Sequence, residues 1–252
     1  MRFGYVRGGI RRSSAPIFDP ATQSWDALFL APYASSPWAG TASLGTSGSR
    51  SLAEATNPPT AGTPVNGKAP STYNGTNQKL TDAANISTYI TTTEGTATAC
   101  FLAAGITGGA SAGYDNPGLL VDLAGGNFGL HVGGATNDKA IAYLYDSIIG
   151  AKKVELAISL STWTYLQFRW KASTSTCEAR LNGGAWVPLS GAAMTSINGT
   201  LAALAAVGRD YSQVKFFNGS ILALACSKTL MTDGELDYFR NYLNATYPGI
   251  SV

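Results

Sequence analysis

Short apolar runs separated by glycine-rich turns recur along most of this 252-residue chain. In residues 154–160 and 163–170, apolar side chains alternate with polar ones, which is the period of a sheet with one buried face. The sequence Asn182-Gly183-Gly184 after the next run is a strong hairpin signal. The predicted strands are 25–30, 71–80, 86–93, 97–104, 118–123, 128–132, 140–145, 154–160, 163–170, 177–181, 201–207 and 221–226. So many short strands predict an all-β fold of two stacked antiparallel sheets.

The end of the chain departs from this pattern. Residues 221–226 are continuously apolar, as in a strand covered on both faces, and a helix is predicted to follow. Thr232-x-x-Glu235 forms a capping box, in which each residue satisfies a free amide at the helix start. Leu236, Phe239 and Leu243 then fall on one helical stripe. We therefore expect one short C-terminal helix that packs through this stripe.

The chain is predicted to form one domain, residues 25–252, preceded by an extended N-terminal arm, residues 1–24. Arg2, Arg7, Arg11 and Arg12 all precede the first acidic residue, Asp19, so the arm is cationic. Such an arm either anchors the protein on an acidic neighbour or is a loose, solvated terminus. Residues 37–64 are rich in Gly, Ser, Thr, Ala and Pro, which predicts a long surface loop that faces a partner.

Three motifs in order resemble the concanavalin A-like (laminin-G-like) jelly-roll family of lectins and glucanases. They are the C-terminal strand and helix, the Asn-Gly turn and aromatic strand of residues 66–80, and the aromatic strand 163–170 with the Asn-Gly hairpin of 178–184. The resemblance implies a jelly-roll sandwich. Members of this family also occur in the virions of tailed phages, and residues 38–50 resemble the early loop of phage-encoded members.

Composition and charge exclude several classes of protein. The formal net charge is +2, which argues against nucleic acid as the main partner. Residues 3–10 are interrupted by glycines and an arginine, so no secretion signal is predicted, and no apolar run is long enough to cross a membrane. The three cysteines, Cys100, Cys177 and Cys226, lack metal-type spacing and lie in apolar runs. We expect them to be buried free thiols.

No catalytic pattern is found. The related glucanases place two carboxylates on one strand, whereas here the dense acidic cluster, Asp233, Glu235 and Asp237, lies at the predicted helix start, where the helix dipole accounts for it. His131 is the only histidine, and no nucleophile motif accompanies it. We expect His131 to be structural and the protein not to be an enzyme.

Aromatic and acidic residues near turns are the remaining candidates for binding. Tyr114, Trp186 and Tyr211 are candidates for stacking on a sugar ring, although such aromatics more often pack on a core. No cofactor is predicted. Calcium is the one metal considered, because some family members hold it with loop carboxylates and carbonyls. The residues that would supply oxygen ligands to calcium here are Asp115, Asn116, Asp122, Asp138 and Asp146.

The leading prediction for function is a non-enzymatic structural protein of a phage virion, displayed as a knob on the capsid or tail. Its partners would be other virion proteins in an oligomeric assembly, and it would be made in the host cytoplasm. The alternative is a carbohydrate-binding adhesin module that recognises a cell-surface polysaccharide. A glycoside hydrolase is the third hypothesis, and the lack of paired carboxylates counts against it.

Overall fold

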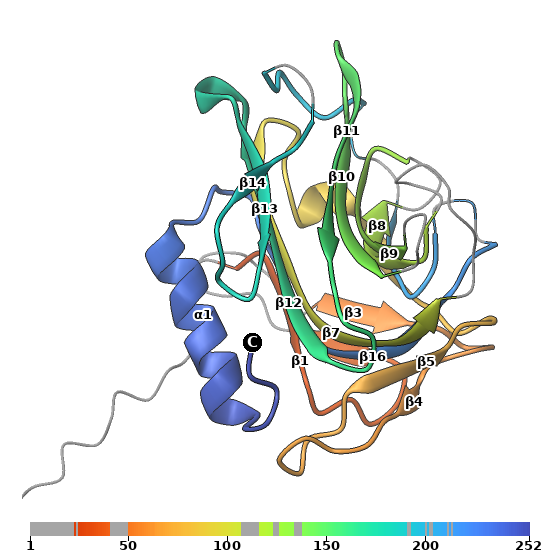
Figure 1. The fold of residues 1–252 in the computed structure, drawn as a ribbon. Coiled ribbons are helices and arrows are strands. Elements are labelled where there is room, and N and C mark those ends of the chain that lie inside the picture. Colours follow the sequence, from red (N-terminus) through yellow and green to blue (C-terminus); the bar gives the residue numbers. More distant parts are fainter. Residues whose placement is uncertain are drawn as a thin grey trace, which may run out of the picture.

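The computed structural model of the chain describes residues 23, 25–40, 50–106, 116–122, 126–133, 138–190, 193–199, 201, 204–210, 212 and 214–252. In them, two antiparallel β-sheets stack face to face, and one helix lies against the outside of one sheet (Figure 1). The predicted two-sheet antiparallel sandwich with one C-terminal helix is therefore confirmed. Apart from Gln23, the predicted arm of residues 1–24 lies outside the described residues, as do all four of its arginines.

The first sheet, sheet A, carries the helix on its outer face. Its strands in spatial order are β14 (Val187–Pro188), β13 (Thr176–Leu181), β12 (Trp163–Lys171), β7 (Glu94–Ile106), β16 (Phe217–Ser227), β5 (Ser71–Asn74) and β4 (Thr60–Ala61). The remaining strand of this sheet, β1 (Ala27–Leu30), pairs with the second half of β16. The long strands β7 and β16 thus form the centre of the sheet, although β16 lies more than a hundred residues after β7.

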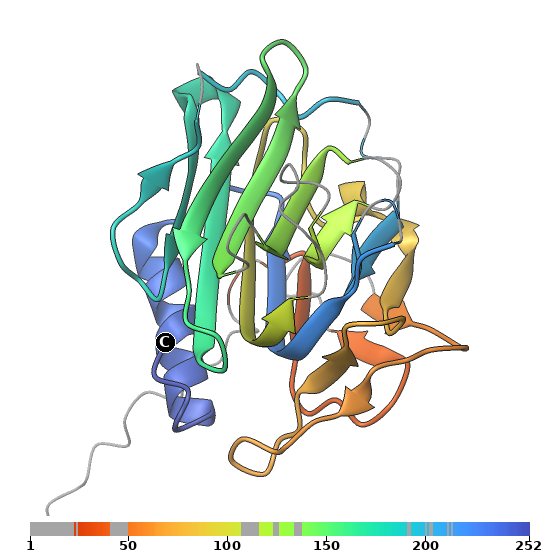
Figure 2. The same cartoon turned by 45° about the vertical axis from the view of Figure 1, so that its right-hand side comes forward.

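The second sheet, sheet B, faces sheet A across the core (Figure 2). Its strands in spatial order are β11 (Gly150–Ala157), β10 (Lys139–Asp146), β9 (Phe128–Gly133), β8 (Gly118–Asp122), β15 (Leu204–Val207), β6 (Leu80–Asn85), β3 (Arg50–Ala53) and β2 (Trp38–Gly40). Within the described ranges, two short 3₁₀ helices, η2 (Ile86–Thr88) and η4 (Ala172–Thr174), connect strands.

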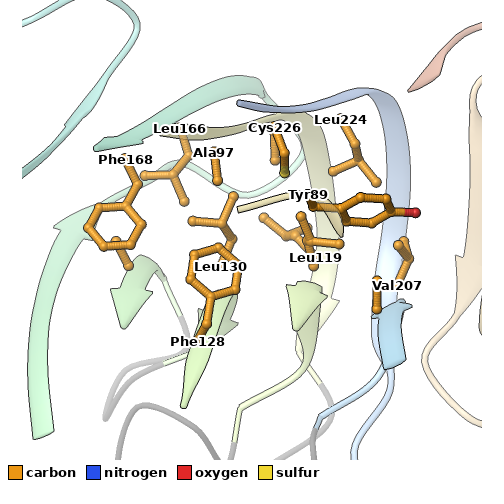
Figure 3. Close-up of a cluster of buried hydrophobic side chains, with 14 of the residues drawn as sticks. Tyr89, Ala97, Leu119, Phe128, Leu130, Leu166, Phe168, Val207, Leu224 and Cys226 are labelled. Atoms are coloured by element: carbon orange, nitrogen blue, oxygen red, sulfur yellow. The ribbon is translucent and has the colours of Figure 1, made fainter. Parts of the chain in front are cut away.

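The main core lies between the two sheets. Figure 3 shows Phe168 and Leu224 pointing inward from sheet A, toward Phe128 and Leu130 from sheet B. The rings of Phe128 and Phe168 stack across the interface, with centroids 6.1 Å apart. Alternation along each strand sends these side chains inward and leaves the neighbouring residues to face outward.

The helix α1 (Asp233–Thr246) forms a second, smaller core with the outer face of sheet A. The predicted capping box is confirmed, since Thr232 accepts a hydrogen bond from the amide of Glu235 and the Glu235 side chain accepts one from the amide of Thr232. The stripe of Leu236, Phe239 and Leu243 is buried, as predicted. No helix among the described residues is long and apolar enough to cross a membrane.

Two predictions about local structure are wrong. Residues 86–93 were expected to form a strand, but Ile86–Thr88 is a 3₁₀ turn, and the amides of Tyr89 and Ile90 donate to the Ile86 carbonyl. Ile86, Tyr89 and Ile90 are all buried, and their spacing of three and four residues is helical. The apolar character of this segment thus reflects a buried turn.

The predicted surface loop of residues 37–64 contains the strands β2, β3 and β4. Trp38 and Leu52 from these strands are almost completely buried in the main core. Each is a single large apolar residue among small ones, so the segment shows no alternating run that would predict a strand.

Candidate functional site

A groove of about 540 Å³ lies on the part of the outer face of sheet A beyond the helix. Residues 61–65, 70 and 72 come from one hairpin, and Leu102, Trp163 and Ser220 come from three different strands. The pairing of the strands brings them together. The residues that line it are Ala61, Gly62, Thr63, Pro64, Val65, Pro70, Thr72, Leu102, Trp163 and Ser220. Its volume lies in the usual range of small-molecule sites, roughly 300–1,000 Å³.

The floor of the groove is one row of side chains across four adjacent strands. In the register of sheet A, Trp163 of β12 lies opposite Leu102 of β7, Leu102 lies opposite Ser220 of β16, and Ser220 lies opposite Thr72 of β5. Residues directly opposite each other point to the same face of a sheet. The row therefore runs from an aromatic ring through an aliphatic side chain to two hydroxyl groups.

The wall of the groove is the hairpin between β4 and β5. Val65 and Lys68 pair through two backbone hydrogen bonds of 3.0 Å, and Asn66 and Gly67 between them both have positive φ. This is the geometry that Asn-Gly favours in a two-residue turn. Asn66 also donates from its side chain to the carbonyl of Thr246 at the end of α1, 3.0 Å away. The hairpin thus lies beside the C-terminal end of the helix (Figures 1 and 2).

The groove depends on a close approach between its wall and its floor. A Cβ atom at Gly62 would lie 2.1 Å from the Oγ1 of Thr72, so a side chain does not fit here without a shift. The hydroxyl of Thr72 is itself held 2.8 Å from the hydroxyl of Ser220. Trp163 is half-buried, because one part of it packs against the helix core and another part faces the groove. The site combines a partly exposed aromatic ring with fixed hydroxyl groups.

Trp186, one of the predicted stacking residues, lies elsewhere, in the connection between β13 and β14, where it contacts the start of α1. The Cζ atoms of Arg169 and Arg180 lie 3.9 and 4.4 Å from the centre of its ring, and its indole N–H donates to Asp233 at 2.9 Å. These contacts give no support to stacking on a sugar. Tyr114 and Tyr211 lie outside the described residues.

The predicted acidic cluster fixes the helix on the sheet. Asp233 accepts from Arg169 at 2.8 Å, and Asp237 accepts from Arg180 at 3.1 Å. Burial alone would raise the pKa of Asp233, but the hydrogen bond from Trp186 and the charges of Arg169 and Arg180 outweigh it and lower this pKa. The cluster at the helix start therefore has a structural explanation.

The acidic residues considered as calcium ligands mainly accept hydrogen bonds or pair with a lysine within the protein. Asp146 accepts hydrogen bonds from the amides of Ile148, Ile149 and Thr195 and from the Thr195 hydroxyl, and although burial opposes the shift, these bonds lower its pKa to about 2. Asp138 pairs with its neighbour Lys139. Over the part of the chain that the structure describes, which excludes Asp115, no three His, Cys, Asp or Glu side chains group closely enough to hold a metal ion.

The sole histidine and the cysteines are buried. His131 lies in β9, and its Nδ1 is 2.8 Å from the carbonyl oxygen of Asn116. Burial lowers the pKa of His131 to about 4, so the ring is neutral near pH 7. Cys100, Cys177 and Cys226 are free, buried thiols, as predicted.

Asp122 should make the stability of the folded protein depend on pH. It is completely buried and accepts hydrogen bonds from the amides of Asn127 and Phe128, yet burial dominates and raises its pKa from 3.8 to about 6. The folded protein thus holds this proton up to about pH 6, whereas the unfolded chain releases it near pH 3.8. The contribution of Asp122 to stability is therefore complete below pH 3.8 and is lost as the pH rises through about 6.

We expect Asp122→Asn to remove this loss, because an amide oxygen can still accept both hydrogen bonds but does not ionise. Relative to the wild type, the free energy of unfolding of the variant should rise by up to about 3 kcal/mol between about pH 4 and pH 7. Urea unfolding at a series of pH values measures this difference. Parallel stability curves over that range would contradict the assignment.

Comparison with known proteins identifies the fold. Neither a scan against protein-family models nor a search of curated proteins finds a match. Among solved structures, the botulinum neurotoxin serotype G binding domain matches with a TM-score of 0.60 at 8% identity, over 88% of this chain and 51% of that one. The binding domain of Paraclostridial Mosquitocidal Protein 1 matches with a TM-score of 0.54 at 9% identity, over 87% of this chain and 53% of that one.

A sialidase from Trypanosoma rangeli, solved with the inhibitor DANA, matches with a TM-score of 0.52 at 11% identity, over 85% of this chain and 32% of the sialidase. This chain thus spans about half the length of the two binding domains and about a third of the sialidase. At such identities the likeness establishes a common sandwich fold, and function must be argued from the site.

Proposed function

We propose that this chain is a non-catalytic carbohydrate-binding module that holds a glycan in the groove beside Trp163. The observation that carries the proposal is the row on the floor, which places an aromatic ring and two hydroxyl groups on one face. A sugar has an apolar face of C–H groups and a rim of hydroxyls. An aromatic surface suits the first, and a few fixed polar groups that set orientation suit the second.

The same lining supports binding without catalysis. Glycoside hydrolysis usually requires two carboxylates that flank the scissile bond, about 5–9.5 Å apart. None of the residues that line the groove is Asp or Glu. A sugar held in this groove would therefore meet no carboxylic acid and no carboxylate nucleophile from its lining.

The structural comparisons are in keeping with a binding role. Two of the similar structures are named as binding domains, and the third is a sialidase. The order of sequence motifs also resembles concanavalin A-like domains, a family that includes lectins. Because one fold serves many functions, the proposal depends on the groove more than on these likenesses.

Display on a phage particle stays a prediction from the sequence resemblance, and the four arginines of the predicted anchoring arm lie outside the described residues. It is compatible with glycan binding, since many copies on one particle would make a weak site effective through avidity. Purified particles should then contain the chain in many copies by mass spectrometry. Its absence from them would end this part of the proposal.

Replacement of Trp163 tests the groove. We expect Trp163→Ala to weaken binding of the glycan by about tenfold or more, because truncation of the aromatic residue of the lining removes most of the apolar contact. The measurement is a glycan array with the protein presented multivalently, followed by titration of the glycans that bind. The melting temperature of the variant checks that it is folded, since Trp163 also packs against the helix core.

Tyr145→Ala is the matched control, because Tyr145 is a partly exposed aromatic residue on the other sheet. It should bind as the wild type does. Equal binding by Trp163→Ala and the wild type would show that the glycan does not use this groove. A multivalent array without any signal would refute carbohydrate binding altogether.

A further inference from the structure

The groove lacks any ionisable side chain, which limits what it can recognise. Its lining consists of small, aliphatic, hydroxyl and aromatic residues together with two prolines. An anionic sugar that enters it would lose part of its hydration and find no cation in the lining to replace it. Burial of a charge without a partner costs far more than burial of a neutral polar group.

The surroundings of the groove do not favour an anion either. The hairpin that forms the wall contacts the C-terminal end of α1 through Asn66, and the last turn of this helix has no basic residue. A helix C-terminus carries a partial negative charge from its free carbonyl groups. Lys68 is the cation of the wall hairpin, and its ammonium group lies 5.5 Å from the centre of the Tyr247 ring, outside the groove lining.

The hydroxyl pair at the other end of the floor also suits a neutral ligand. Thr72 and Ser220 share one hydrogen bond, in which either can be the donor. Each hydroxyl has one O–H and two lone pairs, so the pair keeps one O–H and several lone pairs for a ligand. A sugar hydroxyl both donates and accepts and can use both kinds of group. A carboxylate only accepts, so the lone pairs of Thr72 and Ser220 offer it nothing.

We infer that the groove selects uncharged oligosaccharides and rejects those that carry a carboxylate. This inference rests on the proposed function, because it names the class of glycan for the same site. Selectivity arises because the neutral sugar pays no uncompensated cost of charge burial. The Trp163 and Leu102 end holds the C–H face, and the Thr72 and Ser220 end holds hydroxyls.

The test uses the whole chain and matched pairs of oligosaccharides. One member of each pair contains glucose, galactose or mannose, and the other has the corresponding uronic acid in the same linkage. We expect at least one neutral member to bind about tenfold or more tightly than its acidic partner, since an unpaired charged group loses more than a neutral one on burial. Isothermal titration at low and at physiological salt measures the ratio.

Two outcomes separate the inference from the proposed function. Equal or tighter binding of a uronic acid member, weakened by Trp163→Ala, would overturn the inference and leave glycan binding at the groove intact. Binding of neither member of any pair, with the protein presented multivalently, would overturn both.

A variant with an added positive charge provides an independent test of this selectivity. Thr63 is exposed on the rim of the groove, so Thr63→Arg would place a guanidinium where a carboxylate could reach it. We expect the ratio of acidic to neutral affinity to rise about fivefold or more, because charge-assisted hydrogen bonds are the strong ones. Thr174→Arg, at an exposed position in η4 at the far end of β12, is the control and should leave the ratio unchanged. An unchanged ratio in Thr63→Arg would contradict the assignment of this groove as the selective site.

Discussion

Gly219→Ala should destabilise the protein by about 3–5 kcal/mol, because backbone strain and overlap with a neighbouring strand add at one position. Gly219 lies in β16 at an irregularity in its pairing with β7, and its φ is +150°. A Cβ atom there would lie 2.2 Å from the carbonyl oxygen of Leu102 and 3.0 Å from the Cα of Ala103. These are backbone atoms at the centre of sheet A, so they cannot rotate away as a flexible side chain can.

Urea unfolding measures the loss, and Gly67→Ala separates its two causes. Gly67 also has a positive φ, +74°, but a Cβ there would meet no atom within 4 Å. We expect Gly67→Ala to cost only about 1–2 kcal/mol, which is the conformational cost of a left-handed residue with a side chain. Equal losses in the two variants would mean that overlap with β7 contributes nothing. Gly219 is next to Ser220 in β16 and pairs with β7, the strand that contains Leu102. Because Ser220 and Leu102 both line the groove, a folded Gly219→Ala protein should also bind glycan less well.

The sandwich itself was predictable from local patterns, because burial on one face imposes alternation. Phe168 and Trp170 alternate with Gln167, Arg169 and Lys171 along β12, and all five positions pair in register with β7 and β13. The capping box at Thr232 is similarly local, since both partners lie within one turn. The prediction of strands failed at two places. Around Ile86, apolar residues with helical spacing were taken for a strand, and around Leu52, small neighbouring residues gave no alternating pattern although a strand is present.

The candidate site was much less predictable, because its residues meet only through strand pairing. Thr72 and Ser220 lie 148 positions apart in the chain, and no local sequence pattern marks either of them as a binding residue. The sequence places Trp163 in an aromatic strand. Because Trp163 and Tyr165 are two residues apart, both point to the same, outer face of the sheet. This alternation was the signal in the sequence that could have identified Trp163. What it could not reveal is that the core under α1 covers Trp163 only in part.

Phe239→Ala should weaken the attachment of α1 to sheet A and cost about 3–5 kcal/mol, the usual loss for truncation of a fully buried phenylalanine. The Phe239 side chain is completely buried, and its ring centre lies 5.1 Å from that of Trp25 and 6.0 Å from that of Tyr165. Truncation removes the ring that joins the helix to both β12 and the segment before β1. Asn241→Ala, at an exposed position of the same helix, should change stability by no more than about 0.5 kcal/mol.

The cysteines distinguish release of the helix from loss of the whole fold. Cys100 points from β7 into the core beneath α1, whereas Cys177 and Cys226 point into the main core between the sheets. Burial raises the pKa of Cys100 far above its ordinary value and makes the thiol unreactive in the wild type. In Phe239→Ala, transient opening of α1 should expose Cys100 first. Thiol labelling followed by mass spectrometry should therefore modify Cys100 well before the other two, and simultaneous labelling of all three would mean that helix and sandwich unfold as one unit.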